Sequence, residues 1–313
     1  MREPLAPLET HVAVMTDGAE IILRRHGNVD KPRLMITNGN GFAVDGYRVF
    51  WEPLLEDYEV VAFDMRNHGQ NKPAGGDGHN YLQFARDVGS VFEAATNRWG
   101  KKKTAGIFHS MSARSALKHA VQMGWVWDAL VLFDPPSVPP RGHELYEPMR
   151  TFEHKLIEFA CNRPDRFSSE EEMLALYREG RASQHWLPEA QEDMARAVLR
   201  KTDEGYELSC QRELEATIYL GALTLNLWPP ASEAGGPVKL IGADPEMKGG
   251  ITGRANQALG LEQGYDFDYV PGTGHLLQIE KPAECREVML SFLHKSRDRL
   301  IADPSSLQHL RCP

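Results

Sequence analysis

A serine between a buried strand and a helix is the residue with the clearest chemical potential. Residues 104–108 form a short apolar run typical of a buried strand, residues 111–124 have helical spacing, and Ser110 lies between them. A serine on such a turn presents its hydroxyl at the carboxyl edge of the sheet, before the unpaired N–H groups of the helix. A neutral hydroxyl needs a base to become a nucleophile. The alternative is that Ser110 only caps the helix.

A histidine near the end of the chain could supply that base. His275 follows a strand-like run, residues 265–270, in a loop that contains Gly272 and Gly274. An imidazole can take the serine proton near neutral pH and return it to a leaving group. The pattern therefore predicts a serine–histidine pair.

Two aspartates could hold the histidine in the required tautomer. Asp244 lies just past the apolar run 237–242, and Asp134 closes the run 129–133. The chain order of serine, acid and histidine leads us to prefer Asp244, with Asp134 as the alternative acid.

A glycine-rich loop could complete this site. Residues 37–42 (TNGNGF) follow another short apolar run, and glycines let a backbone approach a ligand closely. The backbone N–H groups of Asn40 and Met111 could together stabilise a developing oxyanion. Phe42 and His109 would then lie next to the reacting atoms, as candidate substrate contacts.

The elements that must position these residues alternate along the chain. An Asp-Gly turn between residues 11–16 and 21–26 indicates a hairpin. Strands and helices then follow in turn, which predicts an α/β fold with a mostly parallel central sheet flanked by helices. The strands are expected at 34–37, 59–63, 104–108, 129–133, 237–242 and 265–270, and helices at 81–99, 111–124 and 282–299.

The strand pattern stops after Pro140 and helical spacing takes over until about residue 225. We interpret residues 136–225 as a helical cap inserted into a core formed by 1–135 and 226–300, with a tail at 301–313. A cap over Ser110 could use aromatic side chains to line an apolar pocket, although each could equally be cap core. The aromatic residues considered are Phe152, Phe159, Tyr177, Trp186, Tyr219 and Trp228, of which Trp186 and Tyr219 are the preferred substrate contacts.

Composition narrows the classes of function. The 313 residues are 42% hydrophobic and 25% charged, as in ordinary globular proteins, and the net charge of −9 disfavours nucleic acid as a partner. The four cysteines have no zinc-site spacing, so we expect no metal and no cofactor. We see no signal peptide or membrane span and expect a cytoplasmic protein with free thiols. The oligomeric state stays open, a homodimer included.

Several motifs in order resemble one family. The chain is similar to the α/β-hydrolase superfamily, in its capped, epoxide-hydrolase-like branch, over roughly residues 10–295. The resemblance rests on Asn38-Gly39, the segment Phe63–Gly69, the elbow at Ser110, Asp244, Gly274-His275 and Glu280-Lys281-Pro282. It implies the α/β-hydrolase fold and a catalytic triad of Ser110, His275 and Asp244. In this family Asp64, Arg66 and His68 shape a loop, so we assign them no chemistry.

The chain departs from the family at two places. The family's elbow has small residues on both sides of the nucleophile, and this chain has Phe108 and Ser112 there. The turn should splay around Phe108, and Ser112 is an alternative nucleophile. Asn38 stands where the family usually has histidine, which suggests a different hydrogen bond within the loop.

The nucleophile type limits the reaction. Relatives that open epoxides or remove halides use a carboxylate at the elbow, whereas serine fits acyl transfer to water. We therefore expect a serine hydrolase that cleaves an ester of a small hydrophobic substrate through an acyl-enzyme. Lactone, thioester or carbon–carbon bond hydrolysis, acyl transfer, and a non-catalytic ligand-binding role are the alternatives.

Overall fold

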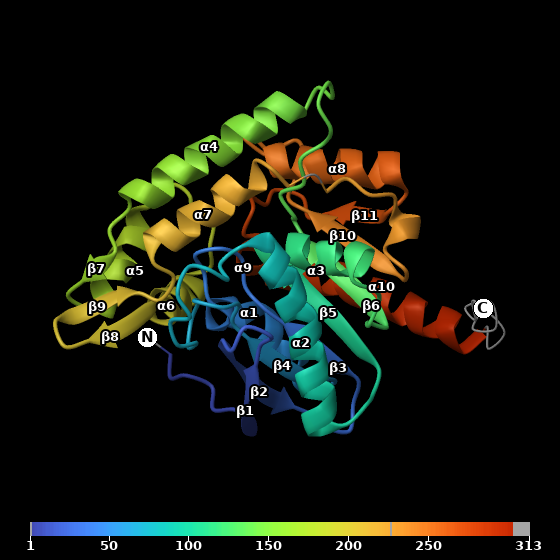
Figure 1. Cartoon of the computed structure of the whole chain (residues 1–313), viewed down its shortest axis with the longest axis horizontal. Coiled ribbons are helices and arrows are strands. Elements are labelled where there is room, and N and C mark those ends of the chain that lie inside the picture. Colours follow the sequence, from blue (N-terminus) through green and yellow to red (C-terminus); the bar gives the residue numbers. More distant parts are fainter. Residues whose placement is uncertain (1, 226, 303–313) are drawn as a thin grey trace.

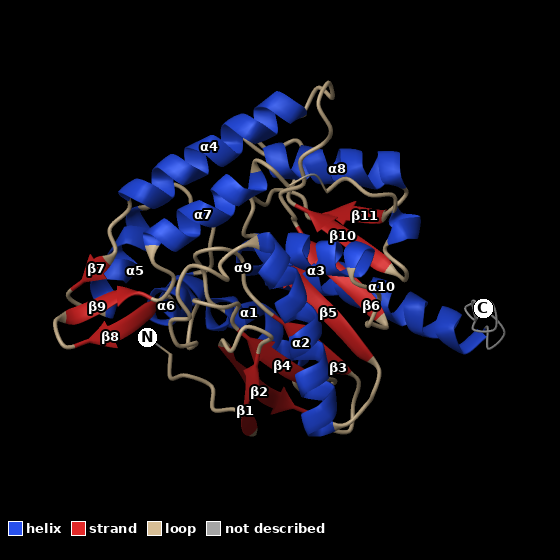
Figure 2. Cartoon of the chain, viewed as in Figure 1, coloured by secondary structure: helices blue, strands red, loops and turns tan. Residues whose placement is uncertain are grey.

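The central sheet carries every element that the candidate site needs. The computed structural model describes residues 2–225 and 227–302. Eight strands lie in the order β1-β2-β4-β3-β5-β6-β10-β11, with β2 antiparallel to both neighbours and all other pairs parallel (Figure 2). Their bounds are β1 Glu9–Val14, β2 Glu20–Gly27, β3 Arg33–Ile36, β4 Glu59–Phe63, β5 Thr104–His109, β6 Ala129–Phe133, β10 Val238–Gly242 and β11 Asp266–Tyr269.

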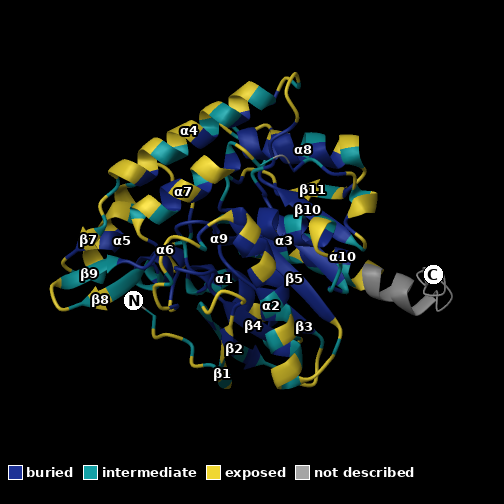
Figure 3. Ribbon diagram, viewed as in Figure 1, coloured by how far each residue is buried: buried dark blue, intermediate teal, exposed yellow. Residues whose placement is uncertain are grey.

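The inner strands are buried along their whole length, which is why they read as continuous apolar runs. All residues of β3, β4, β5, β6 and β10 are buried, and these strands fill the centre of Figure 3. Alternate side chains enter different cores: Leu34 and Ile36 lie in one apolar cluster and Met35 in the other. The expected mostly parallel sheet is confirmed.

Helices cover both faces of the sheet. α1 (Arg48–Trp51), α9 (Leu277–Glu280) and α10 (Pro282–Ala302) pack on one face, and α2 (Tyr81–Trp99), α3 (Met111–Gln122) and α8 (Ile251–Gln263) on the other. Three short 3₁₀ turns, η1 Val44–Tyr47, η2 Glu52–Leu54 and η3 Ala231–Glu233, complete this part. α10 runs to Ala302, and most of the expected tail lies outside the described residues.

The segment between β6 and β10 contains the expected helices and also a small sheet that the sequence analysis missed. α4 packs along α7 in Figure 1, with α5 and α6 beside them. The elements are α4 Tyr146–Asn162, β7 Arg166–Phe167, α5 Glu170–Glu179, α6 Pro188–Ala197, β8 Leu199–Thr202, β9 Gly205–Leu208 and α7 Arg212–Ala222. The helix α6 ends at Ala197. The hairpin that follows is short and half-exposed, so it has no strong apolar signature.

Membrane-spanning helices, metal sites and free thiols can each be looked for among the described residues. Within the described ranges, no helix combines the length and the apolar character that a bilayer crossing requires. The same ranges contain no cluster of three His, Cys, Asp or Glu side chains arranged to hold a metal ion. Cys161, Cys210 and Cys285 are free thiols, and Cys312 lies outside the described residues.

Candidate active site

Ser110 forms the sharp turn between β5 and α3. Its backbone lies in the left-handed region (φ 55°), which non-glycine residues rarely adopt. Its N–H donates to the carbonyl of Phe133 on the neighbouring strand β6. The side chain makes no capping hydrogen bond, so the capping alternative is wrong. Instead, the Ser110 hydroxyl lies 2.8 Å from Nε2 of His275.

The flanking residues of the turn have structural roles. Oγ of Ser112 donates to the carbonyl of His109 and accepts from the N–H of the same residue. Ser112 is fully buried and contacts the backbone of the elbow, so the structure does not favour it as the nucleophile. The Phe108 ring lies over Gly106 of the same strand and against Trp127. The family has a small residue at the position of Phe108. Here the larger side chain fits because Gly106, two residues earlier on the same strand, has no side chain and leaves room for the ring.

The carboxylate beside His275 is Asp134. Its Oδ2 lies 2.6 Å from Nδ1 of His275, and its Oδ1 accepts from the N–H of Ala243 and the side chain of Asn256. Asp134 is completely buried at the end of β6. Burial acts to raise the pKa of Asp134, but the hydrogen bond and charge of His275 outweigh it and hold this pKa below its usual value. Asp134 is therefore an ionised acceptor that fixes the imidazole.

The preference for Asp244 as the carboxylate that holds His275 was wrong. The carboxylate of Asp244 accepts from the backbone N–H groups of Gly272 and Glu246. It braces the loop that carries His275 without contacting the imidazole. Asp134 follows β6 and Asp244 follows β10, and these two parallel strands are neighbours in the sheet. Chain order alone therefore does not say which aspartate reaches the histidine. β6 lies next to β5, which places Asp134 beside Ser110.

The glycine loop lies directly against the serine. A Cβ built on Gly39 would be 3.1 Å from the Ser110 Cβ and 2.8 Å from Nδ1 of His109. The side chain of Asn38 holds the loop closed: its amide donates to the carbonyls of Gly39 and Phe42. Asn38 thus supplies the different loop hydrogen bond that was expected of it.

Two backbone N–H groups at this site remain for a ligand. Gly39 donates to the Tyr47 hydroxyl and Gly41 to Nε2 of His68, whereas no hydrogen bond among the described residues uses the N–H of Asn40. The N–H of Met111 begins α3 and has no acceptor within the helix. Both N–H groups are therefore available to a ligand, as an oxyanion hole would require.

The loop that contains Asp64, Arg66 and His68 has the shaping role that the resemblance implied. Asp64 accepts from the N–H groups of Val44 and Gln70, and Arg66 pairs with Asp87. Nδ1 of His68 donates to the carbonyl of Arg66, which leaves Nε2 to accept from Gly41. Burial lowers the pKa of His68 to about 4, so it is a neutral acceptor.

The candidate substrate contacts divide into two groups. Phe42 and Trp186 form an edge-to-face pair 5.8 Å apart beside the glycine loop. His109 is completely buried with both ring nitrogens bonded to protein atoms, so its assignment as a substrate contact is wrong. The Tyr219 hydroxyl donates to Glu215. Phe159 is 60% exposed, so the structure does not support it as a pocket residue.

A polar contact between α7 and the glycine loop escaped the sequence analysis. The carboxylate of Glu215 on α7 lies against Gly41 and pairs with Arg163 at 2.9 Å, and the Asn40 amide donates to the Glu215 carbonyl. Tyr47 was also missed. Nothing in the local sequence marks these residues, because their partners lie 175 and 62 positions away.

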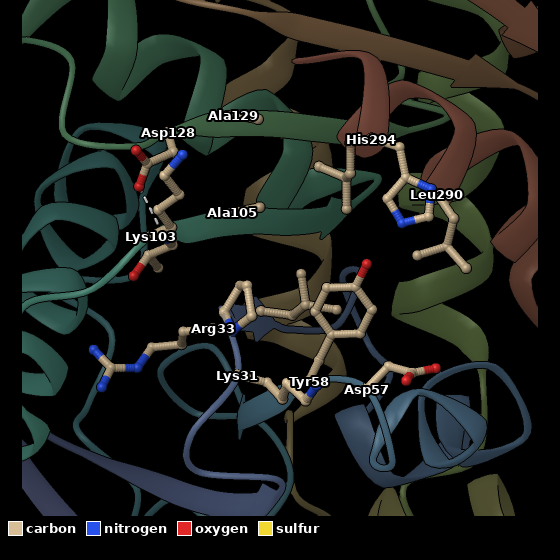
Figure 4. Close-up of a pocket in the computed structure, with 14 residues that line it drawn as sticks. Lys31, Arg33, Asp57, Tyr58, Lys103, Ala105, Asp128, Ala129, Leu290 and His294 are labelled. Carbon is tan, nitrogen blue, oxygen red and sulfur yellow. Dashed lines mark hydrogen bonds between the residues drawn. The ribbon is translucent and has the colours of Figure 1, made fainter. Parts of the chain in front are cut away.

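Two cavities lie away from this site. One, of about 370 Å³, opens at the amino ends of β3, β5 and β6 beside α10 (Figure 4). Ser110 lies at the opposite edge of the sheet. The other, of about 420 Å³, lies beside α4 and is lined in part by Arg141, Tyr146 and Arg150. Neither includes a residue of the Ser110–His275–Asp134 cluster.

Comparison with known proteins identifies the family. The family model described as the alpha/beta hydrolase family matches residues 34–288. The chain therefore belongs to the α/β-hydrolase family. No curated protein matches the sequence.

Solved structures agree with this assignment. The chain is similar to E-2-(acetamidomethylene)succinate hydrolase (TM-score 0.74, 15% identity, covering 91% of this chain and 100% of the other). It is also similar to a thermophilic esterase from Thermogutta terrifontis (0.64, 17%, 92% and 99%) and to an esterase from Exiguobacterium antarcticum (0.66, 15%, 93% and 100%). At these identities the likeness shows the fold alone.

The two aspartates can be separated by matched substitutions. In Asp134→Asn, the amide cannot stabilise an imidazolium and favours the wrong tautomer of His275, so turnover of a short-chain nitrophenyl ester should fall on the order of 10³- to 10⁴-fold. In Asp244→Asn, the side-chain oxygen can still accept from Gly272, and the loss should stay below about 10-fold. Circular dichroism checks that both variants are folded. A larger loss in Asp244→Asn would contradict the assignment.

The close approach of Gly39 to Ser110 leads to a second prediction. A methyl group in Gly39→Ala must displace the loop or the elbow, which should lower kcat/KM about 100-fold. Gly76→Ala is the control, because its new methyl group would meet only Leu214, at 3.6 Å. Equal activity of the two variants would mean that the loop does not contact the reacting atoms.

The buried His68 should make stability depend on pH. The folded pKa of about 4 lies below the ordinary 6.5, so the unfolded chain binds this proton first. Stability from His68 is complete above about pH 6.5 and is lost as pH falls towards 4. Between pH 6.5 and 5.0, wild type should lose about 2 kcal/mol more unfolding free energy than His68→Gln. Urea titrations at both pH values test this. Identical losses in the two proteins would show that folding does not lower the pKa of His68.

Proposed function

We propose that this protein is a serine hydrolase that cleaves an ester through an acyl-enzyme on Ser110. One observation carries the proposal: an unbroken chain of hydrogen bonds runs from the Ser110 hydroxyl through His275 to Asp134. The membership of the hydrolase family and the esterases among the similar folds support it.

The proposal gives each group a step. Asp134 accepts the Nδ1 proton of His275, so Nε2 is free to take the proton of Ser110 as Oγ attacks the ester carbonyl carbon. The carbonyl oxygen becomes an oxyanion, to which Asn40 and Met111 donate their N–H groups. His275 then gives its proton to the leaving alcohol, and the acyl group stays on Ser110. Water attacks next, again deprotonated by His275, and releases the acid and the free serine.

The substrate class follows from the surroundings of the serine. The half-buried ring of Phe42, packed on buried Trp186, lies beside the glycine loop and suits a small hydrophobic group of the ester. Lactones and thioesters react by the same first step, as do activated carbon–carbon bonds and acyl transfer to an acceptor other than water. We place esters first because their hydrolysis is the commonest chemistry of such a triad.

Active-site labelling tests the proposal. A fluorophosphonate probe should add one adduct to the wild type, detected by intact mass, and short-chain nitrophenyl esters should be hydrolysed. Both signals should vanish in Ser110→Ala and persist in Ser112→Ala. Of these two serines, Ser110 is hydrogen-bonded to His275, whereas Ser112 is hydrogen-bonded to the backbone of His109. A wild type that is neither labelled nor active would favour a ligand-binding role. Turnover that survives Ser110→Ala would mean that a different nucleophile acts.

A further inference from the structure

The imidazole of His109 joins three segments that meet at Ser110. Its Nε2 lies 2.9 Å from the backbone oxygen of His275, and its Nδ1 lies 2.8 Å from the Tyr47 hydroxyl. The Tyr47 oxygen in turn accepts from the N–H of Gly39 at 3.3 Å. The ring therefore lies between the loop of the base and the glycine loop, while its own backbone precedes the nucleophile.

The partners determine the tautomer of His109. A carbonyl oxygen only accepts hydrogen bonds, so Nε2 must carry the hydrogen. Nδ1 then has a free lone pair and accepts from the Tyr47 hydroxyl, whose oxygen accepts from Gly39. Every donor in this chain has one acceptor, and reversing one bond would leave a buried polar atom unpaired.

The ring is also kept neutral. His109 is completely buried and Tyr47 is 1% exposed. Burial, and then repulsion from a positive charge on His275, lower the pKa of His109 to about 3. The rings of His109 and His275 are 4.9 Å apart, so a charged His109 would oppose the imidazolium that His275 must form during turnover. A neutral donor can brace the catalytic histidine without this repulsion.

We propose that His109 is a positioning residue of the Ser110 site. It holds the backbone of His275 and, through Tyr47, the glycine loop at fixed distances from the serine. The inference rests on the serine-hydrolase function proposed above. A proton relay and an oxyanion site lose efficiency when their parts shift by as little as 1 Å, so a brace common to both should act on kcat.

Matched substitutions separate positioning from general stability. His109→Leu removes both hydrogen bonds, whereas His109→Gln can place an amide N–H near the position of Nε2. We expect kcat of His109→Leu to fall about 10- to 100-fold with KM within about 3-fold, and His109→Gln to regain most of that loss. Tyr47→Phe keeps the bond to His275 and should lose less than His109→Leu. If all variants lose kcat only in proportion to folded protein, or if His109→Leu equals wild type, the proposal is overturned.

A measurement independent of turnover distinguishes failure of the brace from failure of the function. In protein labelled with ¹⁵N at histidine, NMR should show His109, assigned by its loss in His109→Gln, as the neutral Nε2–H tautomer from pH 5 to pH 8. Titration in this range, or an Nδ1–H tautomer, would overturn the proposal even in an active enzyme. If the tautomer is as expected but wild type neither hydrolyses esters nor reacts with the fluorophosphonate, the serine-hydrolase function fails, and the positioning role with it.

Discussion

The left-handed backbone of Ser110 is the constraint on which the rest of the site depends. This turn directs the hydroxyl out of the sheet edge, and a backbone in such a sparsely populated region costs about 1–3 kcal/mol relative to an ordinary conformation. Its neighbours maintain it: Phe133 accepts the serine N–H, and Ser112 bonds to the backbone on the other side. The same hydrogen bond to β6 brings the end of that strand, and with it Asp134, to the serine. The strained turn and the position of the acid are thus one feature.

The helices between β6 and β10 are joined to this site through buried charges. Glu215 of α7 is 3% exposed and contacts Gly41, and Glu153 of α4 pairs at 2.9 Å with Arg114, one turn beyond Ser110. Removing one partner of such a pair leaves an uncompensated buried charge, at a typical cost of 3–5 kcal/mol. An apolar contact could slide, whereas paired charges fix the register of α4 and α7 on the rest of the structure. Docking of α7 therefore adds to the contacts that hold the glycine loop, through Asn40 and Gly41.

The local sequence predicted those features that depend on neighbouring residues in the chain, such as buried strands, helices and strand-end turns. The inner strands were found because both faces are buried, and α2 was placed at its observed ends because its stripe is regular. Ser110 and His275 were found because strand ends and glycine loops mark them. Asp134 was ranked second, since two parallel strands end in aspartate and only lateral strand order separates them. Tyr47 and Glu215 carry no local signal, because their partners are far away in the chain, and β8 was hidden by its half-exposed residues.

The exposure of the three residues bears on the choice between hydrolysis and acyl transfer. Asp134 is buried and Ser110 is 7% exposed, whereas the side chain of His275 is 27% exposed. An acyl group on Ser110 would lie next to the member of the cluster that is most exposed to solvent. A transferase must keep water from the base while the acyl-enzyme waits for its acceptor, and nothing among the described contacts shields His275 in that way. An accessible base lets water act as the acceptor, which favours the hydrolytic reaction that we propose over transfer to a second substrate.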